Sequence, residues 1–372
     1  MTKTTGSTDF SFIYVIDPPN LITHAIPLLL SLRRHHPDTP IYPYAPLGKA
    51  DQVPDRVKAI HAAMNAPIQT LSRELAFSMN RYQKPYHHGH KLLAVAENRP
   101  HAFCVFVDTD TLLRKPLNDP TLFQHDKIAA VPESVAGYAQ RFMDVWEETY
   151  AIFDLPLPDE RVKMLRTNRE TAPYYNAGFV AFPETVPDGT RFGARWLETA
   201  LTLDFDQRID DERKRPWLDQ ASLPVAVYRS GCRFETLTPA FNYPIDGTMF
   251  PANDDAVLYH YHGFERLEAA ESMHEIEDLL LASGRFASFE HFCTPLNMRR
   301  NAINAIMRQV AGLAELRRSL KPQIVALKGK GPSDASKSLN VQMLEARRKN
   351  HELRQSLTDV TEDNFYDETW GV

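Results

Sequence analysis

Cysteine is scarce in this chain, since its 372 residues include only Cys104, Cys232 and Cys293. These three lie far apart and form no C-x-x-C pair, which excludes a disulfide framework and a thiolate zinc site of the usual spacing. Long hydrophobic runs are also missing, and none approaches the ~20 residues that a membrane-spanning helix needs. The formal net charge is -6, so the strong positive charge that is typical of nucleic-acid-binding proteins is missing too.

The first residues, MTKTTGSTDFSFIYVID, lack the basic-then-apolar layout of a secretory signal peptide. Together with the scattered cysteines, this layout leads us to expect a protein of the reducing cytoplasm. With 43% hydrophobic and 24% charged residues, the composition is ordinary for a soluble globular protein. The length suggests about two to three domain-sized units.

Apolar residues alternate between strand and helix patterns along the first part of the chain. Residues 10–17 (FSFIYVID) predict a strand, and residues 20–37 predict an amphipathic helix that ends at a proline. Residues 103–107 (FCVFV) predict a buried strand further along. This alternation favours an α/β fold with a largely parallel sheet that is flanked by helices.

Two carboxylates, Asp108 and Asp110, follow the buried strand in the stretch VDTDTLL. Ligands of α/β folds bind beyond the carboxyl ends of the strands, so we expect both side chains in a binding cleft. Divalent ions such as Mg²⁺ and Mn²⁺ prefer carboxylate oxygen and often bridge to substrate phosphates. The alternative is an acidic turn whose side chains cap the next segment.

Three later stretches also place polar groups at the ends of strands or helices. APYYNAGFVAFPE holds Asn176 at the mouth of an apolar strand, and RPWLDQASLPVAVYRSG holds Asp219 and Gln220 at the start of a helix. AVLYHYHGFERLE reads as a strand that ends at His260. Because His260 and His262 alternate along that strand, we expect them to face opposite sides and only one of them to bind a metal here.

These motifs together resemble those of GT-A-fold glycosyltransferases, most closely the retaining family 8 enzymes. That family includes bacterial lipopolysaccharide galactosyl- and glucosyltransferases and glycogenin. The matching pieces are VDTDTLL, YYNAGFVAF, LDQ, HYHG and the lysine of GHKLLAVAEN, and they fall within residues 10–266. The resemblance implies a GT-A (Rossmann-like) mixed, largely parallel sheet flanked by helices. It also implies metal-dependent, retaining transfer of a sugar from a nucleotide-sugar, such as a UDP-sugar, in bacterial cell-surface polysaccharide synthesis.

The resemblance further implies roles for individual residues. The ligands implied for Mn²⁺ or Mg²⁺ are Asp108, Asp110 and His260. Asp219 and Gln220 would be catalytic. The residues implied to bind the donor are Asp17, Lys91, Asp108, Asn176, Gly263 and Arg266.

The histidine motif departs from the bacterial pattern, which continues to K-P-W. Here Arg266 stands in place of the lysine, and Leu267 and Glu268 stand in place of the proline and tryptophan. Arginine can bind phosphate through two hydrogen bonds, so a phosphate role survives this change. The sugar specificity of a relative, however, does not transfer to this chain.

The stretch PYHHGHK, Pro85 to Lys91, resembles a metal cluster by composition. Its H-H-x-H spacing is not one of the established metal motifs. We therefore interpret it as the start of a helix rather than as a second metal site.

The C-terminal part predicts helices outside the catalytic domain. We expect a catalytic domain over 1–270, a helical extension over 271–325, and a linker, short helix and acidic disordered tail over 326–372. Residues 299–330 carry eight basic residues and one acidic residue in an amphipathic pattern. Such a helix either lies on an anionic membrane surface, at the inner face of the membrane, or packs on the catalytic domain with a solvated basic face.

Two other functions stay open at this point. A nucleotidyltransferase on a related α/β fold needs a glycine-rich phosphate loop after the first strand, but that position reads VIDPPNLITH, without glycine. The other alternative is a non-catalytic nucleotide- or carbohydrate-binding protein that kept the GT-A fold. For the enzyme, the expected partners are a nucleotide-sugar donor and a glycan or glycolipid acceptor.

Overall fold

The computed structural model describes residues 9–18, 21–79, 85–135, 138, 144–328 and 334–359. The chain divides into two compact units, Met1–Arg285 and Phe286–Val372. Among the described residues, no helix combines the length and the apolar character that crossing a bilayer requires.

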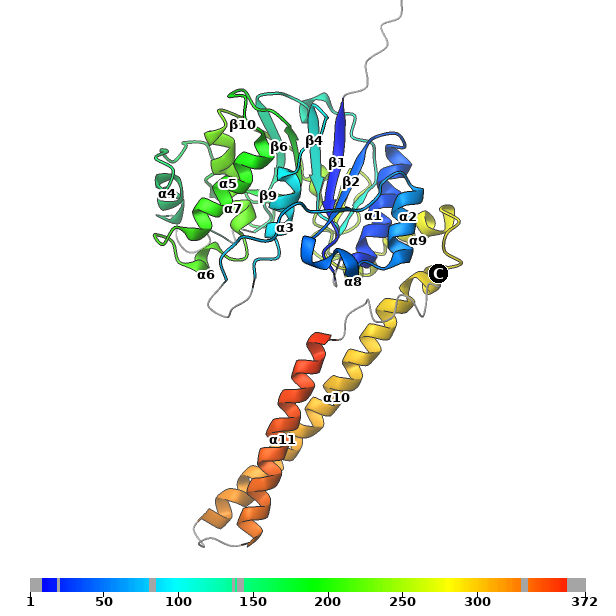
Figure 1. The fold of residues 1–372 in the computed structure, drawn as a ribbon, viewed down its shortest axis with the longest axis vertical. Helices are drawn as coiled ribbons and strands as arrows, with labels where there is room; N and C mark the ends of the chain where they lie inside the picture. The colour runs from blue at the N-terminus through cyan, green and yellow to red at the C-terminus, as the bar shows by residue number, and fades with distance from the viewer. Residues whose placement is uncertain are drawn as a thin grey trace, which may run out of the picture. The chain divides into compact units, whose positions relative to one another are not determined.

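A seven-stranded sheet forms the centre of the first unit (Figure 1), in the order β10-β6-β9-β4-β1-β2-β3. β1 pairs in parallel with β2 and β4, whereas β9 runs antiparallel to both β4 and β6. The predicted mixed, largely parallel sheet is therefore confirmed. The strands of this sheet are β1 (Phe10–Val15), β2 (Ile41–Ala45), β3 (Gln69–Thr70), β4 (Phe103–Val107), β6 (Lys127–Pro132), β9 (Tyr175–Pro183) and β10 (Arg233–Thr236).

The central strands are apolar on both faces because helices cover both sides of the sheet. Every residue of β1 and β4 is buried, which is the pattern expected where neither face meets water. The helices of this unit are α1 (Ile22–His35), α2 (Asp55–Ala63), α3 (Gly89–Ala96), α4 (Asp144–Ala151), α5 (Phe192–Phe205), α6 (Asp211–Lys214), α7 (Leu218–Arg229), α8 (Phe264–Ala269) and α9 (Met273–Ala282). Short 3₁₀ turns span Leu47–Gln52, Pro120–Leu122 and Pro239–Asn242.

Helices α3, α5 and α7 form one packed group, in which α5 contacts both of the others. Figure 1 shows α5 and α7 side by side. Trp196 of α5 is fully buried in the core, and its indole N–H donates to the backbone carbonyl of Asp219 at 3.1 Å. The start of α7, which carries Asp219, is thereby fixed against the core of the unit.

Two small antiparallel ribbons lie outside the main sheet. β5 (Thr111–Leu113) pairs with β11 (Leu258–His260), and β7 (Val162–Lys163) pairs with β8 (Glu170–Thr171). The β5–β11 ribbon positions the site, because it joins the end of the D-x-D stretch to the histidine motif.

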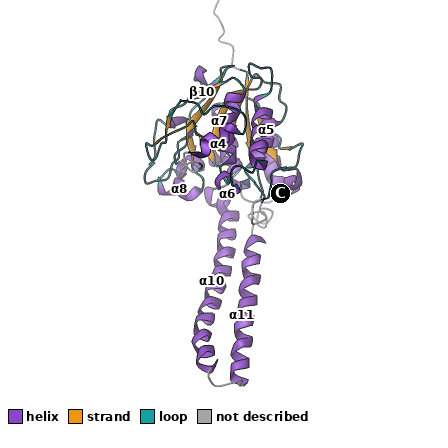
Figure 2. Ribbon diagram, turned by 90° about the vertical axis from the view of Figure 1, so that its left-hand side faces the viewer, coloured by secondary structure: helices purple, strands orange, loops and turns teal. Residues whose placement is uncertain are grey.

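The second unit consists of two long helices, α10 (Phe289–Lys328) and α11 (Asp334–Asp359), which run side by side in both views (Figures 1 and 2). The predicted apolar face of α10 is the less exposed one, and Val310 on it is buried. α11 begins at Asp334, within residues 326–372, for which the sequence predicted a linker, a short helix and a tail. Aspartate is a residue that commonly starts a helix. Residues 360–372 of the predicted acidic tail lie outside the described residues.

Candidate active site

The D-x-D stretch forms a tight turn between β4 and β5, so its two carboxylates converge instead of lying along a strand. The hydroxyl of Thr109 donates a hydrogen bond to the carbonyl of Val15 at the end of β1. The backbone N–H of Asp108 donates to the carbonyl of Gly178 at 2.9 Å, and the N–H of Tyr261 donates to the carbonyl of Asp110 at 3.1 Å. Three separate segments therefore hold this turn in place.

His260 reaches the D-x-D turn through the pairing of β5 with β11, in which it lies opposite Thr111. Its Nε2 lies 3.4 Å from Oδ1 of Asp110 and 3.9 Å from Oδ2 of Asp108. The ring is buried, with a 4% exposed fraction. The structure thus brings together the three side chains that the sequence proposed as metal ligands.

His262 lies on the same side as His260, so the expectation that the two histidines face opposite sides was wrong. The strand ends at His260, and His262 has a φ of 56°, in the left-handed region that a non-glycine residue seldom adopts. This backbone conformation turns its ring back, and the two imidazole centroids are 3.9 Å apart. Nδ1 of His262 lies 3.7 Å from Oδ2 of Asp110, and ligand atoms of Asp110, His260 and His262 all lie within 4.8 Å of one another.

The charges in this cluster shift each other's ionisation. Burial on its own would raise the pKa of Asp110, but the imidazoles of His260 and His262 hold that pKa well below its ordinary value. Burial would likewise lower the pKa of His260, yet the carboxylates of Asp110 and Asp108 raise it. The pKa of His262 is lowered, first by the neighbouring charge of His260 and then by burial.

The donor atoms in this cluster fit a divalent cation. Carboxylate oxygens suit Mg²⁺ and Mn²⁺, and imidazole nitrogens suit transition ions. Donors held about 2.0–2.3 Å from one ion lie about 3–4 Å from each other. The 3.4 Å and 3.9 Å separations between His260 and the two aspartates fall in that range.

Lys91, from α3, connects the D-x-D turn to the start of α7. Its Nζ lies 3.0 Å from Oδ1 of Asp108 and 2.9 Å from Oδ2 of Asp219. Burial would lower the pKa of Lys91, but the two carboxylates raise it, so the side chain stays an ammonium. Tyr86 donates its hydroxyl hydrogen to the other oxygen of Asp219 at 2.7 Å. Both carboxylate oxygens of Asp219 are therefore hydrogen-bonded.

Glu133 orients two amide side chains from other elements. Its Oε2 accepts from Nδ2 of Asn176 at 2.7 Å and from Nε2 of Gln220 at 2.8 Å. The hydroxyl of Tyr174 donates to Oε1 of Gln220 at 2.7 Å, and the N–H of Gly178 donates to Oδ1 of Asn176 at 2.8 Å. Each amide is thus held at both of its ends.

A cavity of about 390 Å³ opens over these groups. Eight of the ten predicted site residues line it, namely Lys91, Asp108, Asp110, Asn176, Asp219, Gln220, His260 and Arg266. Asp17 lines an adjacent cavity of about 250 Å³, together with Lys91, Asp108 and Asp110. Gly263 lines neither cavity; it precedes α8, and a Cβ added there would meet the carboxylate of Glu265.

The sequence analysis did not identify Glu133 as a site residue, and it did not predict that His262 lies beside Asp110 together with His260. Glu133 directly follows the apolar strand β6, as Asp108 follows β4, so its place at a strand end was a usable signal. The position of His262 depends on one backbone angle, which no residue pattern reveals.

Comparison with solved structures gave weak similarities to glycosyltransferases. A galactosyltransferase, LgtC, solved with donor and acceptor sugar analogs, is 13% identical, with a TM-score of 0.45; the match covers 72% of this chain and 95% of that one. Mouse xyloside xylosyltransferase 1 is 14% identical, with a TM-score of 0.42; that match covers 68% and 97% of the two chains. Comparison with curated proteins gave no match.

The sequence itself gives the family. Residues 12–231, more than half of the chain, match the family described as the Rhodobacterales glycosyltransferase domain. That segment contains the D-x-D turn, Lys91, Asn176, Asp219 and Gln220. The resemblance to glycosyltransferases found in the motifs is therefore confirmed, and the chain belongs to the Rhodobacterales glycosyltransferase domain family.

Proposed function

We propose that the protein transfers a sugar from a nucleotide-sugar, a UDP-sugar, to an acceptor hydroxyl with retention of configuration, aided by a divalent ion. The observation that carries the proposal is the convergence of Asp108, Asp110 and His260 in one cavity with Lys91. Membership of a glycosyltransferase family supports sugar transfer as the reaction class.

Asp108, Asp110 and His260 would hold the ion, and His262 would complete the set. Two carboxylates with two imidazoles favour Mn²⁺ over Mg²⁺, because Mg²⁺ strongly prefers oxygen donors. When bound, such an ion stabilises the negative charge that develops on a nucleoside diphosphate leaving group.

The cations of the cavity would bind the phosphates of the donor. Lys91 is fixed as a buried ammonium between Asp108 and Asp219, so its charge is in place before the donor arrives. Arg266 lines the same cavity and could donate two parallel hydrogen bonds to a phosphate. We place the nucleoside end in the adjacent cavity, beside Asp17.

The sugar would lie against Asn176 and Gln220, the two amides that Glu133 holds. Retaining sugar transfer passes through an oxocarbenium-like centre, which a nearby carbonyl oxygen can stabilise. We assign this role to Oε1 of Gln220, which keeps a second lone pair beside the one that accepts from Tyr174. Asp219 would act as a positioning residue, since both of its oxygens are occupied and one of them holds Lys91.

The acceptor would be a glycan or glycolipid of bacterial cell-surface polysaccharide synthesis. A glycolipid acceptor would bring the enzyme to a membrane, where residues 299–330 could contact anionic headgroups. Arg308, Arg318 and Lys321 of α10 are exposed, whereas Val310 on the apolar face is buried. Such a contact would therefore be electrostatic rather than an insertion of that apolar face.

Thermal stabilisation by ligands tests the donor site. A ligand at a hundredfold excess over its Kd stabilises the folded state by about 2.7 kcal/mol. For a unit of this size, that corresponds to a rise in Tm of about 5 °C or more. We expect UDP or a UDP-sugar to give this rise only with Mn²⁺, and Asp110→Ala to abolish it.

Asp254→Ala is the matched control, because that carboxylate is fully exposed and outside both cavities. It should respond to Mn²⁺ and UDP as the wild type does. Well-folded protein that ignores every nucleotide with Mn²⁺ present would refute the proposal. Binding without any metal-dependent hydrolysis or transfer would instead favour a non-catalytic nucleotide-binding protein.

A further inference from the structure

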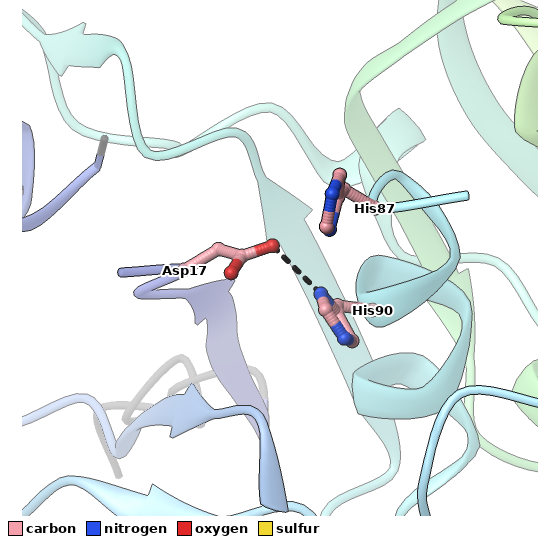
Figure 3. A group of neighbouring side chains, drawn as sticks. All are labelled: Asp17, His87 and His90. Atoms are coloured by element: carbon pink, nitrogen blue, oxygen red, sulfur yellow. Dashed lines mark hydrogen bonds and ion pairs between the residues drawn. The ribbon is translucent and has the colours of Figure 1, made fainter. Parts of the chain in front are cut away.

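A second group of metal-ligating side chains lies in the first unit, beside the D-x-D turn. Asp17 follows β1, and His87 and His90 come from the turn before α3 and from its first turn. Figure 3 shows the three side chains pointing toward one another from these two segments. Each offers a ligand atom, and these atoms all lie within 4.8 Å of one another.

We propose that Asp17, His87 and His90 bind a transition-metal ion of the Zn²⁺ class at a site separate from the Asp108–Asp110–His260 cluster. Two imidazoles and one carboxylate are a ligand set that Zn²⁺ and similar transition-metal ions favour. Mg²⁺ instead prefers ligands that are all oxygen. The i, i+3 spacing of His87 and His90 brings both rings to one side of the helix start. On this proposal, the PYHHGHK stretch supplies two metal ligands in addition to starting α3.

The contacts of Asp17 prepare it to be a ligand. Nζ of Lys49 lies 2.7 Å from its Oδ1 and 2.8 Å from the carbonyl of Pro18, which fixes the carboxylate and leaves Oδ2 toward His90. Hydrogen bonds of this kind to the non-ligating oxygen orient carboxylate ligands in metal sites. The carboxylate is only 12% exposed, so it is held within the fold.

The geometry of His90 needs only a small change to admit an ion. Its Nδ1 lies 2.7 Å from Oδ2 of Asp17. Two donors bound tetrahedrally at about 2.0–2.1 Å lie about 3.3 Å apart, so the pair would open by roughly half an ångström. His90 would then bind through Nδ1 and carry its proton on Nε2. His87 is exposed, which gives the ion a path from solvent.

The site shares the 250 Å³ cavity with Lys91, Asp108 and Asp110. An ion bound by Asp17 would therefore occupy space beside the D-x-D turn. If the nucleoside end of the donor lies there, which rests on the proposed function, Zn²⁺ and the nucleotide compete for the cavity. The metal site itself does not depend on that function, because binding can be measured without a nucleotide.

Zinc titration of the full chain, by calorimetry and by metal analysis after desalting, tests the proposal. We expect two Zn²⁺ per chain for the wild type and one for His87→Ala, with affinity at the second site lowered more than about tenfold. The Asp110→Ala variant should still bind one Zn²⁺, the ion that Asp17, His87 and His90 would hold. Cobalt substitution gives a second readout, since loss of an imidazole ligand changes the visible spectrum.

His88→Ala is the matched control, because His88 is exposed and lines the same cavity but does not belong to the group of three proposed ligands. It should keep both ions. His90→Gln is a second variant that can still hydrogen-bond to Asp17 but offers no ring nitrogen, and it should lose one ion. The proposal is overturned if His87→Ala binds Zn²⁺ as the wild type does, or if Asp110→Ala binds none.

Discussion

Replacing Gly178 by alanine should damage the proposed metal site at Asp108, Asp110 and His260 without replacing any proposed ligand. An ideal Cβ at this position would lie 2.6 Å from Cε1 and 2.8 Å from Nδ1 of His260, and 2.7 Å from Oδ1 of Asn176. Carbon atoms in contact prefer about 3.5–4.0 Å, so the imidazole must move by about 1 Å. Gly178 does not have a positive φ, so the effect comes from the added methyl group and not from backbone strain.

The size of the effect follows from the tolerance of metal bonds. Ligand distances vary by only about 0.2 Å around their ideal values, so a shift of about 1 Å removes His260 as a ligand. We expect Mn²⁺ affinity, measured by calorimetry, to fall about 10–100-fold. Mutations of residues that orient metal ligands typically reduce metal affinity by this factor. Overpacking should also lower the free energy of unfolding by about 1–3 kcal/mol.

A double-mutant cycle separates this mechanism from general damage. In a His260→Ala background there is no ring to displace, so Gly178→Ala should change Mn²⁺ affinity little. Gly48→Ala is the control, because a Cβ there meets no atom within 4 Å. The reasoning is refuted if Gly178→Ala binds Mn²⁺ like the wild type, or if its loss of affinity persists without His260.

Two further predictions concern the amide network and the buried histidines. Glu133→Gln replaces an acceptor of hydrogen bonds from Asn176 and Gln220, and an unmet buried bond costs about 1–3 kcal/mol. Sugar transfer should therefore fall at least about tenfold while Mn²⁺ affinity is kept; unchanged transfer would contradict the role of Glu133. Burial lowers the pKa of both His36 and His61 to about 4. Because the unfolded chain binds their protons near pH 6.5, stability should be lost as the pH falls from there toward 4, by about 2 kcal/mol per histidine at pH 5. In urea unfolding, the free energy of unfolding of His36→Gln should fall by about 2 kcal/mol less between pH 7 and pH 5 than that of the wild type. An identical fall in both proteins would contradict the low pKa assigned to His36.

The sequence predicted the parts of the site that depend on local patterns. β1 and β4 appear as uninterrupted apolar runs, and a pair of carboxylates after such a run indicates a strand end in an α/β fold. The start of α7 was predicted for a similar reason, because a periodic apolar stretch begins at Leu218. These signals fall within a few neighbouring residues, where spacing alone carries the information.

The rest of the site depends on contacts that spacing does not encode. β5 and β11 are three residues each and far apart in the chain, yet their register decides that His260 lies opposite Thr111. Strands this short have no recognisable period. The left-handed φ of His262 and the two amides on Glu133 likewise arise only when distant elements meet.

The contact of Lys91 with both Asp108 and Asp219 has a consequence for how the protein folds. Its three members come from α3, the end of β4 and the start of α7, so no single segment contains all three. A chain in which α7 has not yet docked leaves the ammonium with one carboxylate and the amide of Gln220 without Glu133. On the proposed function, binding of a metal–nucleotide complex requires all three of these elements in place, so the proposed donor complex would also report the assembly of the first unit during refolding.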